Sequence, residues 1–386
     1  MTTMTSVDRF VINRNSEMVP QIPIENLYYL LCYAWDVTDQ LNKVKVDGEH
    51  SHSLENLLAS VLTNACERLL RRGLVQEYLF REQEVEGIRG KLNLAETLKS
   101  HRYRQGKTIC TIDELTNDVL INQLIYLTLK RLVRLDSLDE KVKQKVRKTA
   151  SKFPHLKEVN VTARTFDRIK LNRNNRFYAL VLNVCKLIWQ STLPDKNKEG
   201  RYEFIDFTED EFCMNAVFEH FLMNFCKQHC KGEYSEVHRE HIDFKLTPYG
   251  MMFEEQEEEA FGVLPMMETD ITLVNPSTNK KHILDAKYYR EALVSKYAGT
   301  QKIRREHLSQ ILSYVMNQEN PQKPETMNAD GTLVYPTVNE DFDFSYTYGD
   351  TNHHIHVRTV NLNQPWQKIE ERVKEIVKLQ TMLVGL

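Results

Sequence analysis

The sequence predicts a mixed α/β chain built as two domains. With 386 residues, 41% hydrophobic and 27% charged, the chain is long enough for two ordinary domains and apolar enough to bury their cores. The polar, turn-rich stretch from Pro194 to Arg201 separates a mainly helix-periodic half from a half in which helix and strand patterns alternate. We therefore expect an N-terminal α+β domain over residues 21–195. Residues 196–386 are expected to form a domain with a central mixed sheet flanked by helices.

The N-terminal half is predicted to be mostly helical after a loose leader at residues 1–20. Apolar residues at helical spacing predict helices over residues 22–34, 54–72, 114–135, 138–152 and 176–191. Residues 78–100 instead alternate polar and apolar positions around Gly87 and Gly90. This alternation indicates short strands about a turn.

The second half is predicted to alternate helices with strands. Its elements are a helix over residues 212–228, strands over 237–246, 267–275 and 282–290, a helix over 305–317, strands over 332–338 and 354–362, and a helix from Trp366. The glutamate-rich stretch 253–262 is expected to be an exposed loop. His353, His354 and His356 are expected to be exposed strand histidines rather than metal ligands.

Composition excludes several classes of protein. Mean hydropathy is −0.50, and no apolar run is long enough for a transmembrane helix. The N-terminus lacks the basic start and apolar block of a secretory signal, so we expect a cytoplasmic protein. Seven dispersed cysteines without a CxxC pair favour reduced thiols over a disulfide framework.

Basic residues concentrate between Lys130 and Arg176, a segment that contains fifteen Lys and Arg but only five Asp and Glu. Such a stretch suits DNA or an acidic partner surface, although a solvated helix face has the same composition. The candidates for DNA contact within it are Arg164, Arg168, Arg173 and Arg176.

Two carboxylates and an amine are predicted to meet in the hairpin formed by residues 267–290. Asp285 and Lys287 lie two positions apart and share a face of one strand, which Asp270 on the neighbouring strand can also face. Carboxylates in an apolar hairpin repel each other, and a divalent cation with oxygen ligands, Mg²⁺ or Mn²⁺, removes that repulsion. With an amine that assists an attacking water, these groups suit metal-assisted phosphodiester hydrolysis. The alternative is a structural Asp–Lys pair on a sheet surface.

The hairpin and its flanking helices resemble the PD-(D/E)xK nuclease superfamily. Asp270 takes the place of the first acidic residue, after Thr269 rather than the usual proline, and Asp285 and Lys287 take the place of (D/E)xK. Gln310 and Tyr314 match the Q-x-x-x-Y element of the RecB-like branch, which implies that they hold the DNA backbone. The resemblance also implies an acidic ligand from the first core helix. Glu219 is the candidate, with a surface glutamate as the alternative.

Several segments in order from about residue 22 to the C-terminus resemble the McrC subunits of McrBC-type modification-dependent restriction systems. They are IPIENLYYLLCYAWD, GIRGKLNLAETL, METDITL with LDAKYY, HLSQILSYV and TLVYPTV. This resemblance implies a nuclease that cuts double-stranded DNA containing a methylated cytosine. It also implies docking of the N-terminal domain on a hexameric AAA+ GTPase, McrB, whose GTP hydrolysis the subunit stimulates.

The sequence contains no recognisable nucleotide-binding motif, which agrees with GTP hydrolysis by the partner. Gly106, Lys107 and Thr108 have the tail of a phosphate-binding loop, but position 101 is His rather than Gly, so we expect GTP to bind the partner. Arg89, Lys91 and Lys107 are candidates for contact with the partner. Two other functions stay open: an adaptor that stimulates the GTPase without cutting, and a RecB-like nuclease that acts alone.

Overall fold

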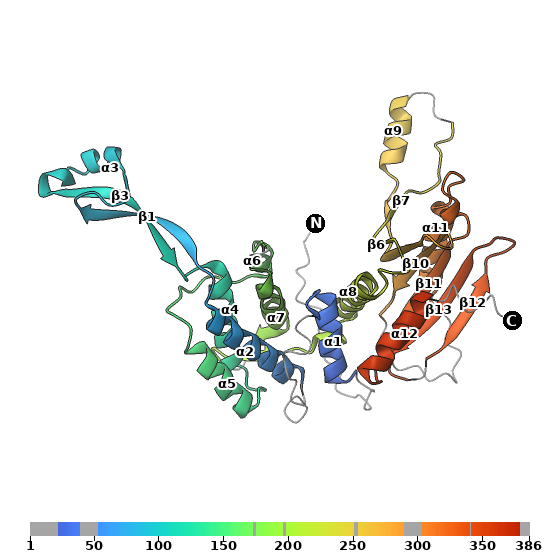
Figure 1. Cartoon of the computed structure of the whole chain (residues 1–386), viewed down its shortest axis with the longest axis horizontal. Helices are drawn as coiled ribbons and strands as arrows, with labels where there is room; N and C mark the ends of the chain where they lie inside the picture. Colours follow the sequence, from blue (N-terminus) through green and yellow to red (C-terminus); the bar gives the residue numbers. More distant parts are fainter. Residues whose placement is uncertain are drawn as a thin grey trace. The chain divides into compact units, whose positions relative to one another are not determined.

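The computed structural model describes residues 22–38, 53–172, 175–195, 198–250, 254–288, 303–339 and 341–378. The chain divides into two compact units (Figure 1). Val37–Phe207 form one, here called the helical unit, and the segment up to Asp36 joins Thr208–Leu386 in the other, here called the sheet unit. The expected boundary near residue 195 lies close to the observed one. The N-terminal segment, however, belongs to the opposite unit from the one predicted, and the leader at residues 1–20 lies outside the described residues.

Packed helices form the core of the helical unit, because each carries an apolar stripe that the others cover. They are α2 (Leu54–Arg72), α4 (Leu120–Val133), α5 (Glu140–Ala150) and α7 (Ala179–Gln190), joined by α6 (Ala163–Asp167), η3 (Arg176–Tyr178), β4 (Thr192–Pro194) and β5 (Tyr202–Phe204). Leu57, Leu62, Leu124 and Leu129 are fully buried between them. The predicted helices 54–72, 138–152 and 176–191 are confirmed within a few residues.

A long β-ribbon, residues 77–116, extends from this helical core and is here called the arm (Figure 1). It contains β1 (Glu77–Glu86), β2 (Lys91–Leu92), α3 (Leu94–Lys99), η2 (Arg102–Gln105) and β3 (Lys107–Thr116), in the antiparallel order β1-β3-β2. The helix predicted from residue 114 is wrong over its first turn. Thr116 pairs with Glu77 across the ribbon, so strand pairing takes precedence there over helical periodicity.

The sheet unit contains a six-stranded mixed sheet, which confirms the predicted fold class. Its order is β12-β13-β11-β10-β9-β6, with β10, β11 and β13 parallel and the others antiparallel. The strands are β6 (Glu236–His238), β9 (Ile271–Asn275), β10 (Lys280–Ala286), β11 (Asp330–Thr337), β12 (Asp343–Thr347) and β13 (His354–Asn361). Strand β12 was not predicted. Its side chains are all exposed, and the alternation of Phe344 and Tyr346 with polar residues spans only five positions.

Between β6 and β9 the chain departs from the prediction. The expected strand 237–246 breaks into β6 and β7 (His241–Ile242), and β7 pairs with β8 (Met267–Glu268) in a small separate sheet. The expected acidic loop is the helix α9 (Glu254–Gly262). Glutamate is a good helix former, so this segment adopts a helix without an apolar face to bury.

Helices cover both faces of the central strands, which explains why β10 and β11 are buried almost throughout. Helix α11 (Arg305–Asn317) packs on the face that carries Ile283, Leu333 and Val357. Helices α8 (Glu211–His229) and α12 (Trp366–Lys378) contact β10, β13 and each other on the opposite face. Short 3-10 turns η4 (Phe207–Glu209) and η5 (Pro324–Thr326) lie before α8 and β11.

Helix α1 (Ile24–Ala34) is part of the sheet unit because it packs on α8 and its side chains bind α12 and the segment just before α12. Asn26 Nδ2 donates to the carbonyl oxygens of Leu362 and Gln364, both at 2.8 Å. The Tyr29 ring stacks on Trp366 with a centroid separation of 4.8 Å. The Tyr33 hydroxyl donates to a Glu370 carboxylate oxygen at 2.9 Å. These long-range contacts correct the expectation that residues 21–195 form a single domain.

Candidate active site

Asp285 and Lys287 lie at the carboxyl end of β10, in the middle of the sheet. Asp285 is fully buried and shares its face with Ile283, so its carboxylate lies on the α11 side. The backbone N–H of Lys287 donates to the Val334 carbonyl at 2.9 Å and extends the parallel pairing past the strand end. Lys287 Nζ lies 2.8 Å from Asp285 Oδ2. Apart from this ion pair, neither carboxylate oxygen of Asp285 has a hydrogen-bond donor among the described residues.

Asp270 reaches the same place from the break between β8 and β9. The antiparallel pairing of Ile271 with Leu284, continued by one residue, places Asp270 opposite Asp285. Its Oδ2 accepts a hydrogen bond of 2.8 Å from the backbone N–H of Ala286, the residue between Asp285 and Lys287. The structure therefore brings together the three side chains that the hairpin pattern singled out.

Burial and mutual repulsion shape the charge of this site. Burial, followed by the charges of Asp285 and Glu219, raises the pKa of Asp270 to about 7. Burial also raises the pKa of Asp285, and the neighbouring Lys287 ammonium only partly opposes it. A further positive charge at this site would favour the ionised form of both carboxylates.

The carboxylate oxygens at this site are the type of ligand atom that binds a hard divalent cation. Fully buried carboxylate oxygens without donors are the ligands that Mg²⁺ and Mn²⁺ prefer. Glu219, on α8, is close enough for its charge to affect both aspartates, but its carboxylate is ion-paired with Arg239 Nη2. Within the described ranges, no three His, Cys, Asp or Glu side chains are already arranged around one ion position. The ligands that this geometry offers are thus Asp270 and Asp285, with Glu219 nearby.

Gln310 and Tyr314 face this site from α11, one helical turn apart. Gln310 Nε2 donates to the Tyr314 hydroxyl at 2.7 Å, and that hydroxyl donates to the Glu268 carbonyl at 2.8 Å. Burial raises the pKa of Tyr314 to about 12, so its hydroxyl stays protonated. Tyr314 therefore contacts the chain just before Asp270, and Gln310 supports the Tyr314 hydroxyl.

A further layer of residues supports the aspartates, and sequence reasoning missed most of it. Lys281 Nζ binds both carboxylate oxygens of Glu240 at 2.8 and 2.9 Å. Glu240 also makes two hydrogen bonds with Thr269: its carbonyl oxygen accepts from the Thr269 N–H at 2.9 Å, and its N–H donates to the Thr269 hydroxyl at 3.0 Å. One signal was present, since Lys281 lies four residues before Asp285 and so shares its face of the strand. Nothing local to Glu240 indicated its role.

The arginines predicted to contact DNA belong to the helical unit, not to the unit that holds the aspartates. Arg164 lies in α6 and Arg168 follows it, and both side chains are exposed. Arg173 lies outside the described residues. Arg176 begins η3, and only its backbone is described.

The candidates for partner contact all lie on the arm. Arg89 and Lys91 are exposed, whereas Lys107 is ion-paired with Glu84 at 2.9 Å. The arm also exposes large apolar side chains that the sequence analysis did not single out. Tyr78, Phe80 and Ile88 are 66%, 68% and 69% exposed.

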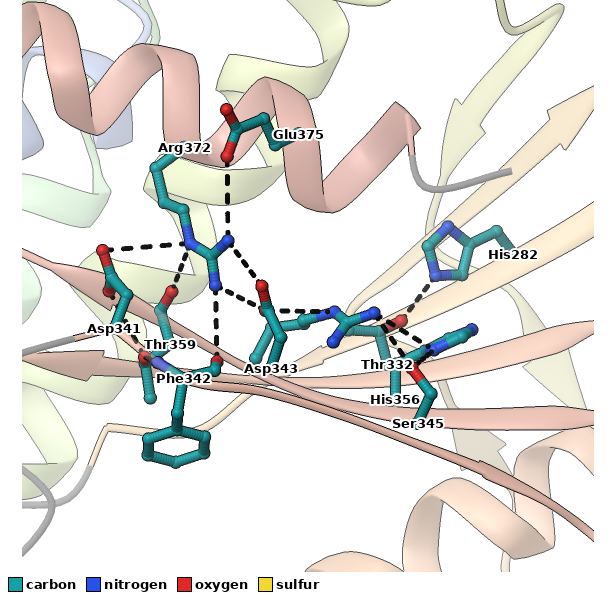
Figure 2. A network of polar contacts seen from close by, with 11 residues as sticks. His282, Thr332, Asp341, Phe342, Asp343, Ser345, His356, Thr359, Arg372 and Glu375 are labelled. Carbon is teal, nitrogen blue, oxygen red and sulfur yellow. Dashed lines mark hydrogen bonds and ion pairs between the residues drawn. The ribbon is translucent and has the colours of Figure 1, made fainter. Parts of the chain in front are cut away.

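The sheet face opposite Asp285 carries a polar network between β10, β11, β12, β13 and α12 (Figure 2). His282 Nε2 lies 2.6 Å from Thr332 Oγ1, His356 Nδ1 lies 2.9 Å from Ser345 Oγ, and Arg372 Nη2 lies 2.5 Å from Asp343 Oδ1. His356 is buried, as is His353, which corrects the expectation of exposed strand histidines. His356 is hydrogen-bonded to Ser345, and His353 to the Ala329 carbonyl and Glu319. These contacts support the fold behind the site.

Comparison with known proteins decides the family. A profile of the McrBC 5-methylcytosine restriction system component family matches residues 11–336. The chain is also 31% identical over 358 residues to the type IV methyl-directed restriction enzyme EcoKMcrBC of Escherichia coli (strain K12), a match that covers 92% of this chain and 97% of that protein. The chain belongs to the McrBC family. Membership in the McrBC family confirms the resemblance noted from the sequence.

A solved structure from the same family has a similar fold. It is a half-complex from the tetradecameric assembly of Thermococcus gammatolerans McrB AAA+ hexamers with bound McrC. The similarity covers 92% of this chain and 76% of that one, with 14% identity and a TM-score of 0.53, which shows a shared McrBC fold. In the part of the chain that is described, no helix is long and apolar enough to cross a membrane.

Proposed function

We propose that this chain is the endonuclease subunit of an McrBC-type restriction complex and cuts double-stranded DNA with a divalent cation. One observation carries the proposal. The Asp270 carboxylate is hydrogen-bonded to the N–H of Ala286, between Asp285 and Lys287, so two buried carboxylates and an ammonium converge at one strand end. Buried charges of this kind cost stability unless a ligand compensates them, which is typical of functional sites.

Each of the three side chains has a role in phosphodiester hydrolysis. When bound, Mg²⁺ or Mn²⁺ would offset the carboxylate repulsion and polarise the phosphate. Asp270 and Asp285 would hold that cation, and Glu219 would join them on leaving Arg239. The Lys287 ammonium orients the attacking water and stabilises negative charge on the phosphate.

The partner in this proposal is a hexameric AAA+ GTPase of the McrB kind, which binds the GTP and recognises the modified cytosine. Three findings support it: membership in the McrBC family, the fold shared with a chain from a complex of McrB hexamers with bound McrC, and the arm. Exposed apolar side chains such as Tyr78 and Phe80 on a projecting ribbon are typical of a docking surface. Arg89 and Lys91 add positive charge to it.

The test uses the full chain with its GTPase partner, GTP, Mg²⁺ and a plasmid carrying methylated cytosine. Asp285→Asn should abolish cleavage and Mn²⁺ binding by the isolated chain, while stimulation of the GTPase stays intact. Lys287→Ala should retain Mn²⁺ binding but cut about 10²–10⁴-fold more slowly. Asp350→Asn, at an exposed aspartate in the turn before β13, is the matched control and should behave as wild type.

Other outcomes identify the alternatives. A wild-type chain that stimulates the GTPase but neither binds Mn²⁺ nor cuts would be an adaptor without nuclease activity. A chain that cuts without partner or GTP would be a stand-alone nuclease. Either result overturns the proposal.

A further inference from the structure

The chain changes sheets immediately before Asp270. Strand β8 pairs with β7 in the small sheet, and β9 pairs with β10 in the large one. Thr269 and Asp270 form the break between them. The direction of the Asp270 side chain therefore depends on the orientation of the peptide group that joins Glu268 to Thr269.

Both ends of that peptide group are held by hydrogen bonds. Its carbonyl oxygen, on Glu268, accepts from the Tyr314 hydroxyl at 2.8 Å. Its N–H, on Thr269, donates to the Glu240 carbonyl at 2.9 Å. Fixing both ends of a planar peptide group leaves it one orientation.

The Thr269 side chain strengthens the same arrangement. Its hydroxyl accepts from the Glu240 N–H at 3.0 Å and lies 2.9 Å from the Thr272 hydroxyl, and Thr269 is fully buried. Hydrogen bonds thus stabilise the break at this position, where no proline ring restricts the backbone.

The Tyr314 hydroxyl is fully used in holding this peptide group. It is only 4% exposed. Its one hydroxyl proton goes to Glu268, and the same oxygen accepts from Gln310. A hydroxyl used in this way has no proton left for a DNA phosphate.

We propose that Tyr314, supported by Gln310 and assisted by Thr269, is a positioning residue that aims the Asp270 carboxylate at a divalent cation. The inference rests on the proposed function, because it assumes that the aspartates bind such an ion. It replaces the expectation that Tyr314 contacts DNA. Outer groups that orient metal ligands typically contribute about 10–100-fold to metal affinity.

The experiment compares wild type with Tyr314→Phe and with Tyr346→Phe, a control at an exposed tyrosine on β12. Mn²⁺ binding by the full-length chain is titrated by electron paramagnetic resonance. Binding of a methylated duplex by the complex with its GTPase is measured in Ca²⁺, and cleavage is measured against Mg²⁺ concentration. We expect Tyr314→Phe to weaken Mn²⁺ binding about tenfold and to raise the Mg²⁺ requirement for cleavage equally, with duplex binding within twofold of wild type. Tyr346→Phe should match wild type throughout.

Thr269 provides a second test that does not depend on the folding of the Tyr314 variant. Thr269→Val removes the hydroxyl at nearly constant shape and should weaken Mn²⁺ binding. Thr269→Ser retains the hydroxyl and should bind Mn²⁺ as wild type does. Unchanged Mn²⁺ affinity in Tyr314→Phe or Thr269→Val overturns the inference, and weaker duplex binding in Tyr314→Phe with unchanged Mn²⁺ affinity would make it a substrate contact. A wild-type chain that binds no Mn²⁺ overturns the proposed function itself.

Discussion

Asp285 shows at the scale of one residue how function opposes stability. A fully buried carboxylate with one ion pair and no other donor among the described residues is costly to the fold. Burial, followed by the charges of Asp285 and Glu219, raises the pKa of its neighbour Asp270 to about 7. The cation of the proposed function would compensate this cost.

His282, on the opposite face of the same strand, makes a pH-dependent contribution to stability. Burial lowers its pKa from 6.5 to about 3, and the attraction of Asp330 opposes this shift only in part. The folded protein therefore keeps this imidazole neutral where the unfolded chain binds a proton. The contribution of His282 to the free energy of unfolding should be fully present above pH 6.5. It should fall by about 1.4 kcal/mol per pH unit as the pH decreases towards 3.

The measurement is urea unfolding of the sheet unit between pH 7.5 and pH 5. His282→Gln, which stays neutral, should reduce the pH slope. Some slope should remain, because burial also lowers the pKa of His307, to about 4. An unchanged slope in His282→Gln would contradict this account.

At the scale of elements, the position of α1 in the sequence gives the wrong structural unit for this helix. Its pattern predicts a helix but not its partner, and the contacts that hold it connect residues more than 330 positions apart. Its unit membership is thus decided by hydrogen bonds and ring stacking with the C-terminal region.

Two buried asparagines test that membership. Asn26→Ala leaves the Leu362 and Gln364 carbonyls without their donor and should lower the stability of the sheet unit by about 1–3 kcal/mol. Asn122→Ala is the counterpart, because Asn122 Nδ2 donates to Val75 and Asn117 inside the helical unit. Hydrogen exchange should increase in α8 and α12 for the first variant and in α2 and α4 for the second. The reverse pattern would restore the predicted domain boundary.

Two glycines test the arm as an element. Gly90 and Gly106 both have positive φ, +77° and +72°. A Cβ at Gly90 would clash with the Thr111 carbonyl oxygen, whereas at Gly106 nothing lies within 4 Å. Gly106→Ala should cost only backbone strain, about 1 kcal/mol. Gly90→Ala should also break the pairing of β2 with β3.

Hydrogen exchange over residues 107–116 and affinity for the GTPase partner report the outcome. We expect faster exchange and weaker partner binding in Gly90→Ala than in Gly106→Ala. Equal behaviour of the two variants would show that close packing at the arm's tip is unimportant for docking.

At the scale of the whole molecule, the two units predict separable functions. The candidate catalytic residues all lie in the sheet unit, and the exposed arm lies in the helical unit. Gly90→Ala should therefore keep Mn²⁺ binding while losing stimulation of the partner's GTPase, and Asp285→Asn should do the opposite. Mn²⁺ titration and GTP hydrolysis, measured on the same preparations, test this. Loss of both activities in either folded variant would show that the units act together.

Much of the site followed from local patterns. The period of two along a strand and a short hairpin turn sufficed to predict that Asp270, Asp285 and Lys287 converge. The helical period similarly predicted that Gln310 and Tyr314 share a face. The acidic helix α9 was mispredicted because an even run of glutamates has no period to read, although each glutamate favours a helix.

The sequence by itself determined the fold class, most helices, the hairpin strands of the candidate site and the identity of its three charged side chains. These depend on spacing over a few residues, which backbone geometry converts directly into shared faces. Only the tertiary structure decided that α1 joins the C-terminal unit, that Tyr314 binds the Glu268 carbonyl, and that Asp285 lacks donors. Those facts depend on which distant groups meet and on which polar atoms are left unmatched, and no local pattern encodes either.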